Sequence, residues 1–183
     1  RFSSTYTILF AAVVCLVCSV LVTSSTVALR ERQEVNEALY MRKNVLLAAG
    51  LAQPDESLAA AEINDRFDRV EPVLIDMKTG KRLGDVNLAE FDPDAEPRLN
   101  VEANKAQVRE VRERRVIYQV LEDGQPGTLI LPIRGKGLWS TLYGFIALDA
   151  QTLKIEGITF YQHAETPGLG GEIDNPDWKA QWQ

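Results

Sequence analysis

Residues 144–172 read GFIALDAQTLKIEGITFYQHAETPGLGGE, two β-rich segments followed by a glycine-rich loop. The segments Gly144–Leu148 and Lys154–Phe160 favour strands, and the polar residues between them predict a hairpin. In the loop, three glycines occupy four positions behind Pro167, so the backbone can approach a ligand closely. We therefore predict a β-hairpin that ends in a ligand-binding loop.

A second glycine-interrupted turn lies upstream, where residues 133–141 read IRGKGLWST. Strand-like runs precede it over residues 116–121 and 128–133, and Asp123-Gly124 between these runs is a hairpin signal. Residues 125–127, QPG, lengthen this predicted connection beyond two residues. If consecutive strands pair as a meander, the two glycine-rich turns meet at one edge of the sheet.

The N-terminal part of the chain is apolar. Residues 6–22 form an almost continuous apolar run, and no charged residue occurs between Arg1 and Arg30. This run approaches the roughly 20 residues that a membrane-spanning helix needs, and it exceeds the apolar segment of a signal peptide. Cys15 and Cys18 lie inside it, where packing explains them better than metal binding because no further ligand is near in sequence.

The rest of the chain has room for one soluble domain with its own core. We expect a transmembrane anchor over residues 1–29, a stalk helix over 30–50 and the soluble domain over 51–183. In the soluble part, the sequence predicts a helix capped by residues 54–57, a strand over residues 72–76 and a surface loop over residues 84–106. The four strands of the two predicted hairpins follow, and a short helix starts at Asn175-Pro176. The predicted fold class is α+β, with a largely antiparallel sheet and flanking helices.

The net charge and the distribution of charged residues limit which classes of partner the chain can have. The chain has 20 Lys and Arg against 26 Asp and Glu, a net charge of −6, which argues against a nucleic-acid partner. The run Arg109–Arg115 alternates in sign, which favours a solvated face, with phosphate binding as the alternative. Basic residues follow the apolar run from Arg30 onward, so the positive-inside rule alone places the soluble domain in the cytoplasm.

The soluble part offers little for hydrolytic chemistry, since it holds one histidine and no cysteine. A divalent ion could use His163, Glu165, Glu172 and Asp174, but their spacing follows no metal-ligand pattern, so we expect no metal there. We assign no catalytic residue. The two turns instead combine backbone donors, an apolar wall and hydroxyl groups, which are the features that a flavin requires.

These motifs carry a resemblance to a known family. The segments GKGLWSTLYGF, GITFY, ETPGLGGE and NPDW occupy residues 135–145, 157–161, 165–172 and 175–178. They resemble the C-type subunit of the sodium-translocating NADH:quinone oxidoreductase, which is similar to the G-type subunit of the Rnf electron-transport complexes, both being FMN-binding domains. The resemblance covers nearly the whole chain, including the single N-terminal membrane helix.

The resemblance implies a membrane-anchored, FMN-carrying electron relay. It implies a bacterial inner-membrane protein whose soluble domain lies in the periplasm, opposite to the charge count. Its partners would be the membrane and the other subunits of the complex, one of which oxidises NADH. The alternative from another class is a membrane-tethered extracytoplasmic binding or sensor module without redox function.

Flavin contacts are expected from both turns. Trp139 and Leu169 would pack against the flavin ring, with core packing as the alternative role of Trp139. Glu165 and Thr166 would form hydrogen bonds with the polar edge of the ring or with the ribityl chain. The expected cofactor-binding residues are Gly137, Leu138, Trp139, Ser140, Thr141, Glu165, Thr166, Gly168, Leu169, Gly170 and Lys179. The family attaches FMN to a threonine in a Ser-Gly-Ala-Thr segment. That segment does not occur in residues 1–183, so we expect a chain that is incomplete at its C-terminal end.

Overall fold

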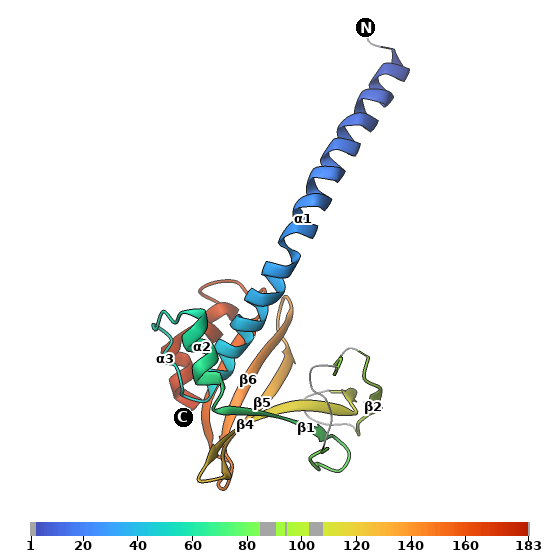
Figure 1. Cartoon of the computed structure of the whole chain (residues 1–183). Coiled ribbons are helices and arrows are strands. Elements are labelled where there is room, and N and C mark those ends of the chain that lie inside the picture. The colour runs from blue at the N-terminus through green and yellow to red at the C-terminus, as the bar shows by residue number, and fades with distance from the viewer. Residues whose placement is uncertain (1–2, 85–90, 94, 103–107, 183) are drawn as a thin grey trace. The chain divides into compact units, whose positions relative to one another are not determined.

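The computed structural model describes residues 3–84, 91–93, 95–102 and 108–182, and the chain divides into two units, Arg1–Leu39 and Tyr40–Gln183. Helix α1, Ser4–Ala48, continues from the first unit into the second (Figure 1). Its apolar part is long and hydrophobic enough to cross a membrane. Gly50 follows the helix with a φ of 68°, as expected for a residue that ends a helix in the left-handed conformation.

The second unit is built on a five-stranded antiparallel sheet of order β1-β4-β5-β6-β7 (Figure 1). Strands β4 to β7 follow one another as hairpins, and β1 pairs with β4 at the edge of the sheet. The predicted meander and the α+β class are therefore confirmed. The strands are β1 Val70–Asp76, β4 Arg114–Glu122, β5 Gln125–Lys136, β6 Thr141–Asp149 and β7 Ile155–Gln162.

The β4–β5 hairpin is tighter than the sequence predicts. Its turn is Asp123-Gly124, and both residues have positive φ, 50° and 77°, which matches the twist of paired strands. Pro126 already lies in β5 opposite Leu121, beside a register shift in the ladder. The longer connection predicted over residues 125–127 is therefore wrong, because an irregular position in a sheet tolerates a proline.

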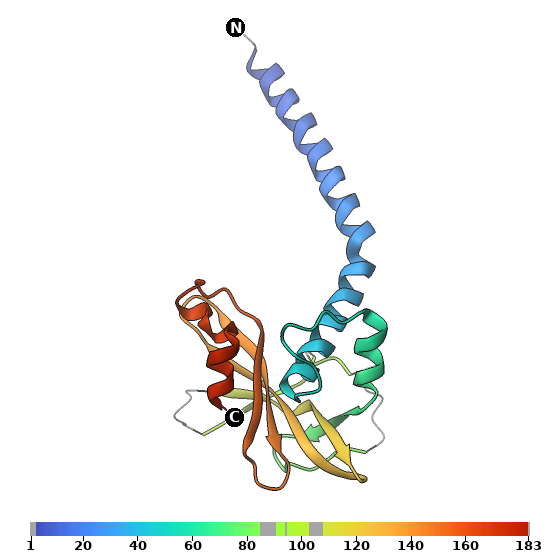
Figure 2. The ribbon, with the colours of Figure 1, turned by 90° about the vertical axis from the view of Figure 1, so that its left-hand side faces the viewer.

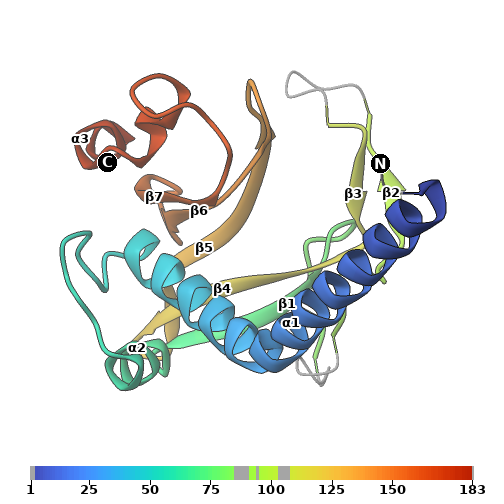
Figure 3. The ribbon, with the colours of Figure 1, turned by 90° about the horizontal axis from the view of Figure 1, so that it is seen from above.

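A separate two-stranded sheet pairs β2, Arg98–Asn100, with β3, Glu110–Arg112. The prediction of a loop over residues 84–106 is therefore wrong for β2, while residues 85–90, 94 and 103–106 of that range lie outside the described residues. A three-residue strand is too short to show a recognisable period. Figures 1 and 3 show this small sheet and the C-terminal helix α3 on opposite sides of the five-stranded sheet.

Helix α2, Ala60–Phe67, begins later than predicted. The carboxylate of Glu62 accepts the backbone N–H of Ala59 at 2.8 Å and so satisfies the helix start from inside the first turn. Glu56, which lies in the predicted cap at residues 54–57, instead forms a two-bond ion pair with Arg66, at 2.8 and 2.5 Å. The predicted cap is therefore wrong because its acidic residue has a different partner.

The end of α1 packs against β7. Leu46 is fully buried there. A Cβ atom added to Gly157 would collide with the carbonyl oxygen of Ala48, and the hydroxyl of Thr159 donates to the carbonyl oxygen of Asn44 at 3.3 Å. Helix and strand can approach this closely only because residue 157 has no side chain.

Aromatic side chains fill the core beside this contact. Phe145 is 1% exposed and lies edge-on to Tyr118, with ring centroids 5.9 Å apart. On its other side Tyr161 stacks on Phe145 at 5.2 Å. These rings join β4, β6 and β7 on one face of the sheet, where aromatic pairs stabilise the packing beyond their buried area.

The C-terminal elements follow β7 and lie beside it (Figure 2). The side chain of Asn175 caps helix α3 by accepting the N–H of Asp177 at 2.9 Å, and Pro176 occupies the first turn, so the predicted helix start is confirmed. Trp178 holds α3 against Phe160 of β7, with ring centroids 6.3 Å apart. The elements are η1 Gly170–Asp174, α3 Pro176–Lys179 and η2 Ala180–Trp182, where η denotes a 3₁₀ helix.

Candidate functional site

Two connections meet at one end of the β6–β7 hairpin. The first, residues 137–140, joins β5 to β6 and is called here the 137–140 turn. The second, residues 163–172, follows β7 and is called the 163–172 loop. Antiparallel pairing places the start of β6 beside the end of β7, so the turn and the loop lie together. The predicted meeting of the two glycine-rich turns is confirmed.

Glu165 joins the loop to the turn. Its side chain is buried, and its two carboxylate oxygens accept backbone N–H groups from Leu138 at 3.2 Å, Trp139 at 3.1 Å and Ser140 at 3.2 Å. Three consecutive donors therefore converge on one anion, an arrangement that resembles the anion-binding nests of tight turns. The carboxylate fixes the backbone of the 137–140 turn.

These donors also control the ionisation of Glu165. Burial alone would raise the pKa of this carboxyl, but the N–H groups of Trp139, Ser140 and Leu138 outweigh burial and hold the pKa below its ordinary value. Hydrogen bonds to an ionised acceptor are stronger than those to a neutral one. The turn is consequently held by a carboxylate rather than by a carboxylic acid at neutral pH.

Glycines surround this carboxylate. A Cβ atom on Gly137 would fall on Oε1 of Glu165, and one on Gly170 would lie 2.7 Å from Oε2. Gly168 has a φ of 75°, which allows the chain to reverse within the loop. The glycines that pointed to a ligand therefore allow the backbone to lie close to the side chain of Glu165.

Three further hydrogen bonds hold the loop in place. The backbone N–H of Ala164 donates to the hydroxyl oxygen of Ser140 at 2.8 Å. The N–H of Glu165 donates to Nδ1 of His163 at 3.2 Å, so the ring proton resides on Nε2, which faces Oδ2 of Asp174 at 2.7 Å. His163 thus links the backbone of Glu165 to the start of the C-terminal helices.

The assembled turn and loop present apolar side chains outward. Leu138, Trp139 and Leu169 are 82%, 70% and 74% exposed. Their backbones are nonetheless ordered, because Glu165 binds the first two N–H groups and the N–H of Leu169 donates to the carbonyl of Thr166 at 3.1 Å. Trp139 is therefore not a core residue, which excludes the alternative role of core packing in this structure.

The remaining predicted site residues come from β6, the 163–172 loop and α3. Thr141 begins β6, and Thr166 lies in the loop, both exposed to solvent. Lys179 reaches the loop through Asp174, at an Nζ–Oδ1 distance of 4.0 Å. Burial lowers the pKa of the Lys179 ammonium, and Asp174 opposes this shift. Among the described residues, the structure thus links Lys179 to Asp174, the partner of His163, and shows no direct contact of Lys179 with the exposed apolar side chains.

The candidate metal ligands do not form a cluster. Among the described residues, no group of three or more His, Cys, Asp or Glu side chains is arranged to hold a metal ion. His163 and Asp174 face one another, whereas Glu165 binds the 137–140 turn. The backbone-binding role of Glu165 was missed from the sequence, because its donors lie 25 to 27 residues away and their N–H groups leave no trace in residue type.

Comparison with known proteins adds independent evidence. The family model of the FMN-binding domain matches residues 137–183, which begin at the 137–140 turn and contain the 163–172 loop. The C-type subunit of the Na(+)-translocating NADH-quinone reductase from Pseudomonas aeruginosa is 43% identical over 98% of this chain and 71% of its own length. The corresponding protein from Neisseria meningitidis is 36% identical over 99% of this chain and 70% of its own length.

Solved structures share the fold. The crystal structure of NqrC from Shewanella oneidensis superposes with a TM-score of 0.66 at 30% identity, over 83% of this chain and 70% of that one. The structure of the corresponding protein from Parabacteroides distasonis gives a TM-score of 0.60 at 23% identity, over 85% of this chain and 68% of that one, which supports the fold. Sequence and fold agree with the resemblance carried by the two glycine-rich turns, and the chain belongs to the NqrC family, the C-type subunits of the Na(+)-translocating NADH-quinone reductases.

Proposed function

We propose that this chain carries FMN at the 137–140 turn and the 163–172 loop and relays electrons within the reductase complex. The supporting observation is the group formed by Leu138, Trp139 and Leu169, which is exposed although the backbone beneath it is fixed by hydrogen bonds. Large apolar side chains held rigidly in solvent mark a binding surface, because their exposure costs free energy that a ligand recovers.

The residues present fit a flavin. Trp139 and Leu169 offer the flat and branched apolar surfaces that a ring system packs against, and the hydroxyls of Ser140, Thr141 and Thr166 suit ribityl or phosphate oxygens. Lys179 would add a positive charge near the flavin. A direct contact between Glu165 and the flavin stays a prediction. A bound flavin would supply the electron-transfer chemistry, while the protein side chains orient it, exclude water and tune its potential.

We further propose that α1 anchors the chain in the bacterial inner membrane with the second unit in the periplasm. The apolar part of α1 supports the anchor, and the family relationship supports the side. The other subunits of the complex would be the partners, with NADH oxidised by one of them. The flavin-binding surface would then serve transfer between subunits.

Flavin titration tests this proposal. Trp139→Ala and Leu169→Ala should each weaken FMN binding to the full chain about tenfold, because each removes a large apolar contact. Leu153→Ala is the matched control, since Leu153 is 63% exposed in the hairpin at the other end of β6 and β7. Flavin fluorescence gives the affinity, and circular dichroism checks the fold.

Two outcomes would contradict the proposal. Equal FMN affinity in all variants would show that the ring lies elsewhere. A full chain without any flavin absorption, after exposure to FMN, would favour the sensor-module alternative. Because residues 1–183 contain no Ser-Gly-Ala-Thr segment, we expect flavin bound to them to be released on denaturation.

A further inference from the structure

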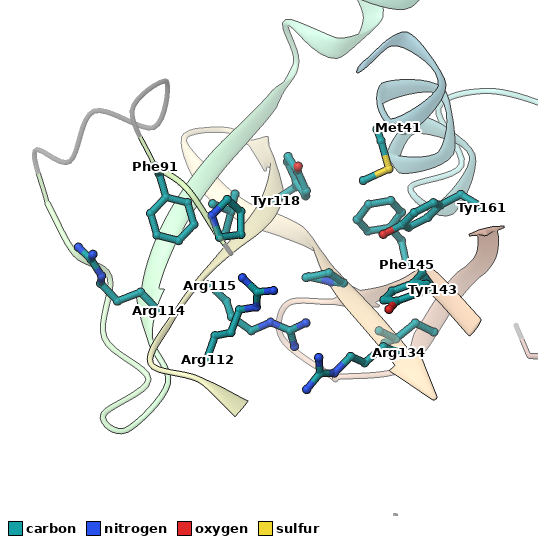
Figure 4. Close-up of a pocket in the computed structure, with 14 residues that line it drawn as sticks. Met41, Phe91, Arg112, Arg114, Arg115, Tyr118, Arg134, Tyr143, Phe145 and Tyr161 are labelled. Carbon is teal, nitrogen blue, oxygen red and sulfur yellow. The ribbon is translucent and has the colours of Figure 1, made fainter. Parts of the chain in front are cut away.

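Three arginines from three strands line the same two cavities of the second unit. Arg112 comes from β3, Arg115 from β4 and Arg134 from β5 (Figure 4). All three line two adjoining cavities of 240 and 230 Å³. The arginine cavity, as we call this site, shares no lining residue with the 137–140 turn or the 163–172 loop.

The lining of the arginine cavity is strongly cationic. Among the described residues, neither cavity is lined by an Asp or a Glu. Arg134 donates to the backbone carbonyl of Glu110 at 3.1 Å. Burial, followed by the neighbouring charges of Arg134 and Arg112, lowers the pKa of the Arg115 guanidinium. Arg115 and Arg134 are two cations in a half-enclosed space, where they repel each other, and an anion would relieve that repulsion.

Arg114, the residue before Arg115, differs from Arg115 in having a carboxylate partner. Arg114 also lines the first cavity, but its guanidinium forms a two-bond pair with the buried carboxylate of Glu96, at 2.8 and 2.5 Å. Both oxygens of the Glu96 carboxylate accept hydrogen bonds from Arg114. In the described part of the chain no carboxylate pairs with Arg115. Both arginines line the first cavity, but only Arg114 is neutralised by a described carboxylate.

We propose that the arginine cavity binds a phosphate group, carried by a soluble phosphate ester or by a lipid headgroup. Guanidinium forks match phosphate oxygens in geometry, and a phosphate offers enough oxygens for several of them at once. Tyr143, which pairs directly with Arg134 across β5 and β6, and Tyr161 supply hydroxyls and ring surface on the adjoining wall (Figure 4). Pro132 and Ile133 give an apolar surface for the organic part of the ligand.

Inorganic phosphate is the probe for a first test on the full, flavin-free chain at constant ionic strength. Calorimetric titration should show one saturable site in the wild type. Arg115→Gln and Arg134→Gln should each weaken it at least about tenfold, because each removes a charge-assisted hydrogen bond. Arg69→Gln is the matched control, since Arg69 is exposed and lines neither cavity. Arg115→Lys keeps the positive charge but loses the forked guanidinium, so its phosphate affinity should lie between those of Arg115→Gln and the Arg69→Gln control.

Stability without ligand provides a second readout. In phosphate-free buffer Arg115→Gln should melt no lower than the wild type, because it removes a partly buried charge with which no carboxylate of the described residues pairs. A clearly lower melting temperature would mean that Arg115 is already satisfied within the chain, and it would overturn the proposal. Equal phosphate affinity in Arg115→Gln, Arg69→Gln and the wild type, or no saturable binding at all, would overturn it as well.

Reconstituted vesicles distinguish the two sources of phosphate. If the ligand is a headgroup, phosphatidic acid in the vesicles should weaken binding of inorganic phosphate to the wild type, relative to vesicles of phosphatidylcholine alone. If the ligand is a soluble ester, glycerol phosphate should compete and phosphatidic acid should not. Since none of these measurements needs a flavin, their result is independent of the proposed electron relay.

Discussion

Ser140 and Glu165 hold each other's segments in place. The backbone N–H of Ser140 donates to Oε1 of Glu165 at 3.2 Å, while the hydroxyl of Ser140 accepts the N–H of Ala164 at 2.8 Å. The two segments are 25 residues apart in the chain, and each contact requires both to be in position. The conformation of the 137–140 turn therefore depends on the 163–172 loop, and the apolar side chains of both are presented together.

Glu165→Gln should disrupt the proposed flavin surface. A glutamine amide has only one oxygen for three N–H donors, and its own N–H group would face donors of the turn. We expect a lower melting temperature and an FMN affinity weaker by about tenfold or more. Glu172→Gln is the control in the same loop, since Glu172 is exposed. Unchanged FMN affinity in Glu165→Gln would show that the flavin does not depend on this turn.

The stability contributed by Glu165 should depend on pH. Because folding lowers the pKa of this carboxyl, its contribution is complete above the ordinary value of 4.5 and is lost as the pH falls through the lower folded value. The difference in melting temperature between wild type and Glu165→Gln should therefore be largest near neutral pH and shrink below pH 4.5. A difference that stays constant down to the acid transition would contradict the ionised hydrogen-bonding role.

Gly144→Ala should destabilise the sheet. A Cβ atom on Gly144 would collide with the carbonyl oxygen of Thr159 on the paired strand, which is backbone and cannot move aside. We expect a loss of about 1–3 kcal/mol or more in the free energy of unfolding. Gly135→Ala, in the neighbouring strand β5, meets nothing within 4 Å and should change stability by less than about 0.5 kcal/mol. Chemical denaturation of both variants measures the contrast.

His163→Gln should leave electron relay largely intact. A flavin needs no dedicated side-chain acid to pass electrons, and the imidazole is engaged with the backbone of Glu165 and with Asp174. We expect flavin reduction in the assembled complex within about threefold of the wild-type rate, which corresponds to less than about 1 kcal/mol. Stopped-flow reduction by NADH measures this rate. A large loss with normal flavin content would assign proton transfer to His163.

Local patterns in the sequence were sufficient for much of the fold. The apolar run, the glycine after α1, the Asp123-Gly124 turn and the Asn175-Pro176 helix start each depend on neighbouring residues, and each appears in the structure. Predictions failed where distant partners decided the outcome. Strand β2 exists because β3 pairs with it, and Glu56 leaves the predicted helix cap because Arg66 binds it.

The sequence by itself determined the two glycine-rich turns, the meander of strands and the apolar N-terminal helix, because turn chemistry and hydrophobic periodicity are local properties of the chain. Only the tertiary structure decided what the charged residues in those segments do. Glu165 is a buried acceptor for three backbone donors, Arg114 pairs with Glu96, and Arg115 lines a cavity in which no described carboxylate pairs with it. Electrostatic partners are set by proximity in space, which residue order does not specify.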